Sequence, residues 1–477
     1  MRRLARAVVA VGLAVGVLAA PASASPSGAG RVPDPGHGSP NMAPVTNLAD
    51  HVDQGQRIRS GGSDIEFADL VVDGQTRRFA LVGSLGRGLQ IVDVSDPENP
   101  TRTAHLRCGI HQGDVQVWRR GGRTMASYTA DYSVDTSTRC YDQLRQRGIN
   151  PGNGLGTVIV NVTNPFRPRA VGFVPIGAGS HNQTVHPSGD YLYNSNSDFS
   201  GNGVIEVIKI TDPTNPVRLA DLPLTGGANS HDITFNDAGT RAYSAALNHS
   251  VVIDTTNPAS PQVIGRIVDP AIQIHHQADP LTVTTPEGTE KTFLIVTDEV
   301  NGGGPAACPG GGLHVYDVTG PRETNPVKLG AWFISDDDPN DGQRGCTSHV
   351  LRMYPDQGIM TIAWYRKGVR VLDISGFAEG DPGPESPMRQ IGWYEFDDTN
   401  AWSVKAPGFL PDGSFYMYSN DIGRGVDVYY FDAGLPESED PGEWVQPDEA
   451  LADAVAGGRL EPDAQASALS YCVIITG

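Results

Sequence analysis

The stretch "LQIVDVSDPENP", residues 89–100, joins an apolar strand to a turn that contains proline. The same combination returns as "TVIVNVTNPFRP" (157–168), "VIEVIKITDPTNP" (204–216), "SVVIDTTNPASP" (250–261), "LHVYDVTGPRETNP" (313–326) and "VRVLDISGF" (369–377), with a degenerate seventh copy, "GVDVYYFDAG" (425–434). Long repeats that consist of short strands are typical of propellers and other closed arrays. Seven copies therefore predict an all-β chain folded as a seven-bladed β-propeller.

Each unit contains enough alternating segments for a four-stranded blade. The quoted run is the third strand, and it is apolar at nearly every position because neighbouring blades cover both faces of a sheet. Proline ends this strand because it cannot donate a ladder hydrogen bond. The seventh unit lacks a fourth strand. The N-terminal segment "NMAPVTNLADHV" (41–52) resembles the fourth strands "NPVRLADLPL" and "NPVKLGAWFI", so residues 43–53 are predicted to pair with blade seven and close the ring.

The runs "LQIVDVSDPENP" and "VRVLDISGF" resemble the LVIVD repeat, which is found in bacterial and archaeal surface or secreted proteins. The resemblance extends over most of residues 63–432. It implies a β-propeller and carries no established reaction. Lys209 stands where the other copies of the repeat end in an acidic or amide residue, so the aspartate at this position is not expected to be catalytic.

The first residues combine arginines, an apolar run and the small residues Ala22-Ser23-Ala24, which predicts a signal peptide over 1–24 and a secreted or cell-surface protein. A flexible leader (25–40), the propeller (41–432) and an acidic, proline-containing tail (433–477) complete the predicted organisation. No later run of about 18 apolar residues could span a membrane. The net charge of −20 argues against a nucleic-acid partner. The composition of the leader points to a bacterial source, and a monomer is expected.

Five cysteines occur without a CxxC motif. In an exported chain we expect two disulfides, Cys108–Cys140 and Cys308–Cys346, because these residues fall in the same two kinds of loop on one face of the propeller. Each bond would tether a long loop. Cys472 remains as a single thiol in the tail. The alternative is that all five are reduced.

Histidines recur at or near the starts of the innermost strands, which places them on the same face as the disulfides: His111, His181, His231, His275, His276 and His349. One interpretation is structural, because a buried imidazole needs hydrogen-bond partners for both nitrogens. The other is a metal site, in which three or four imidazoles surround zinc, copper or another divalent ion. Glu299 follows a second strand on this face and is a candidate carboxylate ligand or general base.

Three functions remain open from the sequence. The leading hypothesis is a non-enzymatic module that binds a small molecule or a protein at the channel mouth, because HExxH and GxSxG motifs are absent. The alternative is a metal-dependent oxidoreductase or hydrolase, similar in outline to propeller enzymes of the selenium-binding-protein kind. A cell-surface adhesion scaffold is the third.

Overall fold

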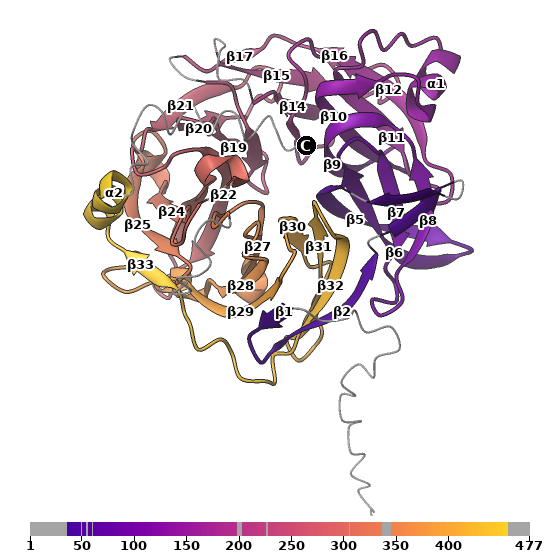
Figure 1. Ribbon diagram of the computed structural model, residues 1–477. Helices are drawn as coiled ribbons and strands as arrows, with labels where there is room; N and C mark the ends of the chain where they lie inside the picture. Colours follow the sequence, from indigo (N-terminus) through magenta and orange to yellow (C-terminus); the bar gives the residue numbers. More distant parts are fainter. Residues whose placement is uncertain are drawn as a thin grey trace, which may run out of the picture.

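The computed structural model describes residues 36–48, 50–53, 56–59, 61–197, 203–225, 228–304, 306–335 and 345–456. Seven sheets surround a central channel, and each blade has its first strand at the channel (Figure 1). The predicted fold, an all-β, seven-bladed propeller with four-stranded blades, is confirmed.

The first four blades follow one another along the chain, and the strands of each blade are ordered from the channel outward. Blade one has β5 (Gly62–Val72), β6 (Gln75–Ser84), β7 (Leu89–Asp93) and β8 (Thr101–Leu106). Blade two has β9 (Gly109–Arg120), β10 (Arg123–Asp135), β11 (Gly156–Asn161) and β12 (Arg169–Pro175). Blade three has β13 (Asn182–Val185), β14 (Tyr191–Ser195), β15 (Val204–Lys209) and the short β16 (Val217–Arg218) and β17 (Leu222–Pro223). Blade four has β18 (Asp232–Phe235), β19 (Arg241–Ala245), β20 (Ser250–Asp254) and β21 (Gln262–Ile267).

The last three blades each receive a strand from near one end of the described chain. Blade five has β22 (His275–Thr284), β23 (Glu290–Asp298), β24 (Leu313–Asp317), β25 (Val327–Phe333) and an added β33 (Glu443–Val445). Blade six has β26 (Leu351–Tyr354), β27 (Ile359–Ala363), β28 (Val369–Asp373), β29 (Arg389–Phe396) and an added β1 (Gly36–Gly38). Blade seven has β30 (Ala401–Lys405), β31 (Phe415–Asp421), β32 (Gly425–Phe431) and β2 (Met42–Leu48).

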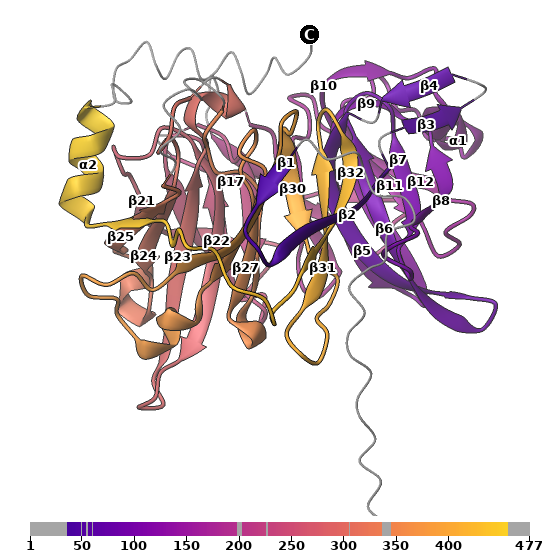
Figure 2. The ribbon, with the colours of Figure 1, turned by 60° about the horizontal axis from the view of Figure 1, so that its bottom comes forward.

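The strand β2 closes the ring. It pairs antiparallel with β32, with Met42 opposite Phe431 and Leu48 opposite Val426 (Figure 2). The predicted closure is thereby confirmed for residues 42–48, whereas β3 (Asp50–Asp53) pairs with β4 (Gln56–Arg59) instead. Because β1 and β33 also join the sheets, the propeller extends beyond the predicted boundaries at residues 41 and 432.

The third strands show why the repeat has its sequence. The strand β7 is buried at all five positions. Its last residue, Asp93, accepts a hydrogen bond through Oδ1 from the backbone N–H of Ser95 at 3.0 Å, and this contact sets the turn. The same contact recurs at Asp254, Asp317 and Asp373. The acid of the repeat is therefore a turn former, and the core lies between adjacent blades.

Few helices interrupt the strands. The helix α1 (Arg139–Gln146) lies in the insertion between β10 and β11, and α2 (Pro447–Ala456) follows β33. The described residues also form four 3-10 turns: η1 (Val300–Gly303), η2 (Gly320–Glu323), η3 (Pro355–Gln357) and η4 (Ser375–Glu379). In the described part of the chain, no helix is long and apolar enough to cross a membrane.

Both predicted disulfides are confirmed. Cys108 and Cys140 join α1 to the start of blade two, with their Cα atoms 5.3 Å apart. Cys308 and Cys346 join the loop after β23 to the segment before β26, with their Cα atoms 5.2 Å apart. Cys472 lies outside the described residues.

Candidate functional site

Four of the six predicted histidines form an arc around the channel. His181, His231, His276 and His349 come from blades three, four, five and six, at or just before the start of each inner strand. Their successive ring centroids are 4.5, 4.3 and 4.2 Å apart. None is more than 5% exposed. The repeat has thus placed equivalent side chains side by side, and we refer to these four residues as the histidine arc.

Hydrogen bonds at Nδ1 orient three of the four rings of the arc. The Nδ1 of His231 donates to the carbonyl oxygen of His276 at 3.0 Å, and that of His349 donates to the carbonyl oxygen of Trp402. The Nδ1 of His181 lies 2.9 Å from Oδ2 of Asp131. A proton fixed on Nδ1 leaves the lone pair on Nε2, which is the arrangement that metal-binding histidines usually have.

The other two predicted histidines lie outside the arc. His275 is buried, but its Nδ1 contacts Oγ of Ser250 at 2.8 Å, between blades four and five. His111 contacts the hydroxyl of Tyr132 at 3.2 Å. Gln112, with a φ of 95°, takes the place beside the arc, and its Nε2 lies 3.0 Å from Nε2 of His181. These two histidines are therefore not placed to share an ion with the arc.

Glu299 meets the middle of the arc from the end of the second strand of blade five. One ligand atom each from His231, His276 and Glu299 lie within 4.8 Å of one another. The Nε2 of His349 lies 3.7 Å from Oε1 of Glu299. The buried hydroxyl of Tyr365 donates to the same Oε1 and fixes the carboxylate. Two imidazoles and one carboxylate form a ligand set for zinc or for non-haem iron.

Burial holds the imidazoles of the arc in their neutral form. It lowers the pKa of His181 and of His349 to about 3. The pKa values of His231 and His276 fall well below the usual range, through burial first and then through the neighbouring histidines. Neutral imidazole is the form that binds a metal, so protons would not compete for these nitrogens near neutral pH.

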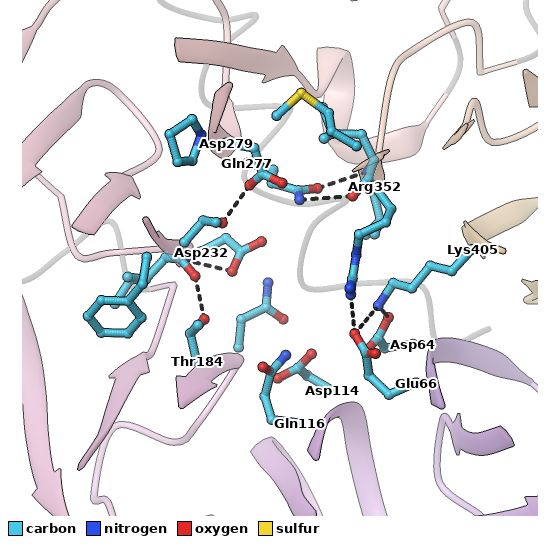
Figure 3. A pocket seen from close by; sticks show the side chains of 18 of the residues that line it. Asp64, Glu66, Asp114, Gln116, Thr184, Asp232, Gln277, Asp279, Arg352 and Lys405 are labelled. Atoms are coloured by element: carbon cyan, nitrogen blue, oxygen red, sulfur yellow. Dashed lines mark hydrogen bonds and ion pairs between the residues drawn. The ribbon is translucent and has the colours of Figure 1, made fainter. Parts of the chain in front are cut away.

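The histidine arc lies at the inner end of a cavity of about 610 Å³. His276, His349 and Trp402 line it at this end. Residues of the inner strands, such as Asp232, Asp279 and Arg352, continue the walls (Figure 3). The lining reaches Asp237 and Asp356, which are exposed in the turns where β18 and β26 end. The cavity therefore runs from the arc toward the face opposite the strand starts, whereas the sequence predicted a site at the histidine-bearing mouth.

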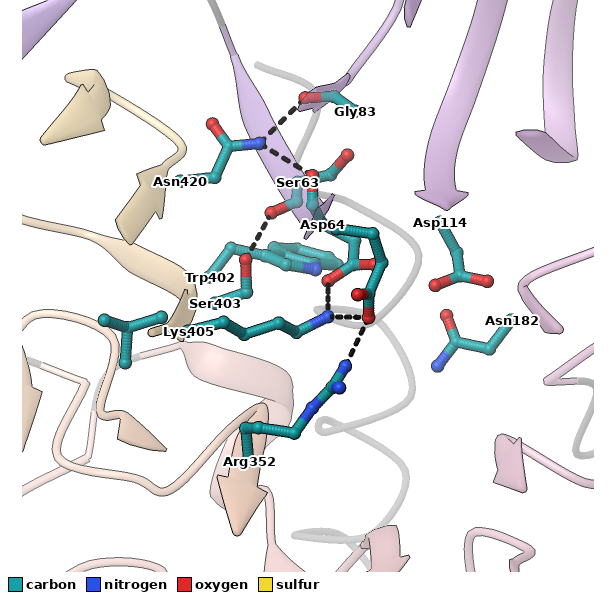
Figure 4. Close-up of polar contacts among 12 residues, drawn as sticks. Ser63, Asp64, Gly83, Asp114, Asn182, Arg352, Trp402, Ser403, Lys405 and Asn420 are labelled. Atoms are coloured by element: carbon teal, nitrogen blue, oxygen red, sulfur yellow. Dashed lines mark hydrogen bonds and ion pairs between the residues drawn. The ribbon is translucent and has the colours of Figure 1, made fainter. Parts of the chain in front are cut away.

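A second set of polar side chains, which the sequence analysis missed, lines the cavity beyond the arc. On one side Lys405 contacts Oδ1 of Asp64 at 2.7 Å (Figure 4). It also contacts Oε1 of Glu66 at 2.8 Å, and Arg352 pairs with Glu66 (Figure 3). Asp64 and Glu66 raise the pKa of Lys405 although burial opposes this. Both positive charges of the cavity are thus already paired.

On the other side lie three aspartates with neutral partners. Asp114 accepts from the backbone N–H of Gln183 at 2.9 Å, Asp232 from that of Ile233 at 2.7 Å, and Asp279 from the hydroxyl of Thr234. Burial raises the pKa of all three, and for Asp114 the nearby Asp64 and Asp232 add to the effect.

A spacing in the sequence could have revealed part of this second set. The third residue after His276 is Asp279, the third after His349 is Arg352, and the third after Trp402 is Lys405. All three line the cavity.

The strand pairing and the channel define a seven-bladed β-propeller. The family model described as LVIVD repeat matches residues 69–104, from the middle of β5 into β8, so the chain carries an LVIVD repeat in blade one. No curated protein matches the chain.

Solved structures with similar chain traces have low sequence identity. A functionally unknown protein from Desulfotomaculum acetoxidans is 13% identical, with 70% of this chain and 90% of that chain covered and a TM-score of 0.43. The periplasmic gluconolactonase of Pseudomonas aeruginosa is 12% identical, with 77% of this chain and 98% of that chain covered and a TM-score of 0.47. The β-propeller domain of Cps50 (Swd1) from Myceliophteria thermophila is 10% identical, with 78% of this chain and 97% of that chain covered and a TM-score of 0.47. The assignment of the fold therefore rests on the strand pairing and the repeat.

Proposed function

We propose that the protein binds a divalent transition-metal ion through His231, His276 and Glu299, and that this ion faces a small polar molecule in the central cavity. The observation that carries the proposal is the approach of these three ligand atoms to within 4.8 Å of one another. Three protein ligands leave coordination positions for water or substrate, as in catalytic rather than structural sites. A metal at this position would act as a Lewis acid or lower the pKa of bound water.

The surroundings support a functional ion. Burial lowers the pKa values of His231 and His276. Tyr365 donates a hydrogen bond to the carboxylate of Glu299, and His349 lies beside it. His276 also lines the cavity, so an ion beside it would be reachable by a ligand. A metal-dependent oxidoreductase or hydrolase is the class of activity that this arrangement favours.

Metal content tests the proposal, and two neighbouring histidines provide a matched pair of variants. Protein without an affinity histidine tag is loaded separately with Zn²⁺, Cu²⁺ and Fe²⁺, desalted and measured by elemental analysis. We expect a near-stoichiometric amount of one metal in the wild type and in His275→Gln, and its loss in His276→Gln. Both residues are buried, but only His276 belongs to the ligand set. Absence of metal from the wild type, or equal loss in both variants, would contradict the proposal.

The second candidate is a binding module without a metal, in which the histidines lock the blades. The bonds from His231 to the carbonyl of His276 and from His349 to the carbonyl of Trp402 favour it, because each joins adjacent blades. In that case His231→Gln would lower the melting temperature of the metal-free protein and leave ligand binding in the cavity intact.

We also propose that the protein is exported. The two disulfides support an oxidising compartment, since such bonds are rare in the reducing cytosol. The predicted signal peptide lies outside the described residues.

A further inference from the structure

We propose that the cavity selects an organic cation, a molecule with one or more protonated amines, whose charged groups lie among Asp114, Asp232 and Asp279. The inference rests on the cavity of the proposed function and is independent of its metal. It identifies the chemical class of the ligand.

The charge balance of the cavity carries the inference. Lys405 and Arg352 are neutralised by Asp64 and Glu66 within one ion-pair cluster. Among the residues that the structure describes, Asp114, Asp232 and Asp279 form no ion pair with lysine or arginine. The lining therefore holds three carboxyl groups without a cationic partner, and a cationic ligand would supply that partner and stabilise their ionised form.

A second observation points to a missing donor. Oδ2 of Asp64 has no hydrogen-bond partner, although the residue is only 5% exposed and lines the cavity. Its other oxygen is held by Lys405. A buried carboxylate oxygen without a donor is costly, so the site is more stable when a ligand N–H reaches it.

An inorganic cation fits this lining poorly. Calcium binds six to eight oxygens at roughly 2.3–2.6 Å, which requires the ligand oxygens to crowd around one point. In the described ranges, the group of histidines and acids whose ligand atoms lie within 4.8 Å of one another is His231, His276 and Glu299, and the three aspartates do not form such a group. They project from β9, β18 and β22, in blades two, four and five (Figure 3). Charges spread in this way suit a molecule with several atoms.

The shape and the apolar lining agree with an amine on a short carbon chain. The cavity of about 610 Å³ has the size typical of small-molecule sites. Phe235 and Trp402 are among its lining residues and offer apolar surface to methylene groups. An aromatic face also attracts a nearby ammonium group. An anion would meet three carboxylates and two cations that are already paired.

Three probes that share a four-carbon chain test the inference: 1,4-diaminobutane, 1,4-butanediol and succinate. Binding to the full-length protein is measured by calorimetry at low ionic strength. We expect binding of the diamine and no measurable binding of the diol or succinate. In Asp114→Asn and Asp279→Asn the affinity for the diamine should fall at least 10-fold. The control Asp73→Asn removes a charge from the exposed turn after β5 and should leave the affinity unchanged.

Several results would overturn the inference. These are equal binding of the diol, stronger binding of succinate, an equal loss in the Asp73 control, or displacement of the diamine by an equal concentration of Ca²⁺. Asp114→Asn should melt at or above the wild-type temperature because it replaces a buried carboxyl group, whose ionisation burial opposes, with a neutral amide, and this separates lost binding from misfolding. Asp279→Asn provides an independent second test.

The His276→Gln variant separates this inference from the proposed metal site. Retained diamine binding in that variant supports an amine site that does not depend on the metal. Loss of diamine binding in a folded His276→Gln protein would place the amine on the metal and overturn the assignment to the aspartates. If the wild type binds no metal but binds the diamine, the proposed metal site fails and the amine site stands.

Discussion

The histidine arc and the carboxylates beyond it lie on the inner strands of the blades, yet burial shifts their pKa values in opposite directions. It lowers the pKa of His349 to about 3 and raises that of Asp114 well above its usual range. Both shifts favour the neutral form. The partners differ as well, since His231 and His349 of the arc are held by backbone carbonyls, whereas Lys405 holds Asp64. One channel thus offers lone pairs to a metal at one end and, further along, carboxyl groups that a cationic ligand would hold in their ionised form.

The largest effect is expected where the carboxylates depend on a buried cation. Lys405→Met leaves Asp64 without its ion-pair partner, and breaking a buried pair costs about 3–5 kcal/mol of unfolding free energy. Urea denaturation measures this loss. Lys209→Met, on an exposed strand position, is the control and should change the stability by less than about 0.5 kcal/mol. Similar stability of the two variants would show that the ion-pair cluster does not support the fold.

A smaller effect, on metal affinity, is expected when the residue that supports Glu299 is changed. Tyr365→Phe removes the hydroxyl that fixes Glu299, and loss of such a supporting partner weakens metal binding by about 10–100-fold. Competition with a chromogenic chelator measures the affinity. Tyr132→Phe, which loses the contact to His111 outside the arc, should bind metal as the wild type does. Equal affinities of the two variants would remove Glu299 from the ligand set.

The pH dependence of stability distinguishes the two kinds of buried group. Burial lowers the pKa of His275 from 6.5 to about 3, so between these values the unfolded chain takes up a proton that the folded chain does not. Acidification below pH 6.5 therefore costs stability, and the slope rises toward about 1.4 kcal/mol per pH unit for one such group as the unfolded chain becomes fully protonated.

Denaturation of metal-free protein at pH 6.5 and 5.5 tests this sign. The wild type should lose about 1 kcal/mol more than His275→Gln over this interval, because the group is half protonated in the unfolded chain at pH 6.5 and almost fully protonated at pH 5.5. Parallel losses in wild type and His275→Gln would mean that His275 is protonated in the folded state.

The smallest effect is expected at the surface. Arg145 and Asp142 form an ion pair of 2.6 Å in α1, with side chains 43% and 54% exposed. Arg145→Ala should cost below about 1 kcal/mol because solvent screens exposed pairs. A loss as large as that of Lys405→Met would show that the difference between the channel and the surface is not one of burial.

Much of the fold was predictable because the repeat records local chemistry. Apolar third strands, the acid that forms the turn and the following proline are all visible in "LQIVDVSDPENP", and the closing strand resembles other fourth strands. The added strands β1 and β33 were not predicted, since three residues with no apolar alternation give no signal.

The candidate site was predictable only in part. The start of β22 is irregular between His275 and Ala278, and such an irregularity breaks the alternation that would tell which of two adjacent histidines faces the channel. A similar irregularity at Gln112 turns His111 away from the arc. The aspartates of the cavity escaped notice because acids are common throughout the chain, and only the closed ring brings those of blades two, four and five together.

The closing strand also has a consequence for the order of events during translation. The ribosome makes β2 among the first strands, but its partner β32 is made near the end of the described chain. Blade seven can therefore be completed only after the other six have been synthesised. Until then β2 has no partner strand. A polypeptide that ends before β32 would form an open ring with two unpaired blade edges.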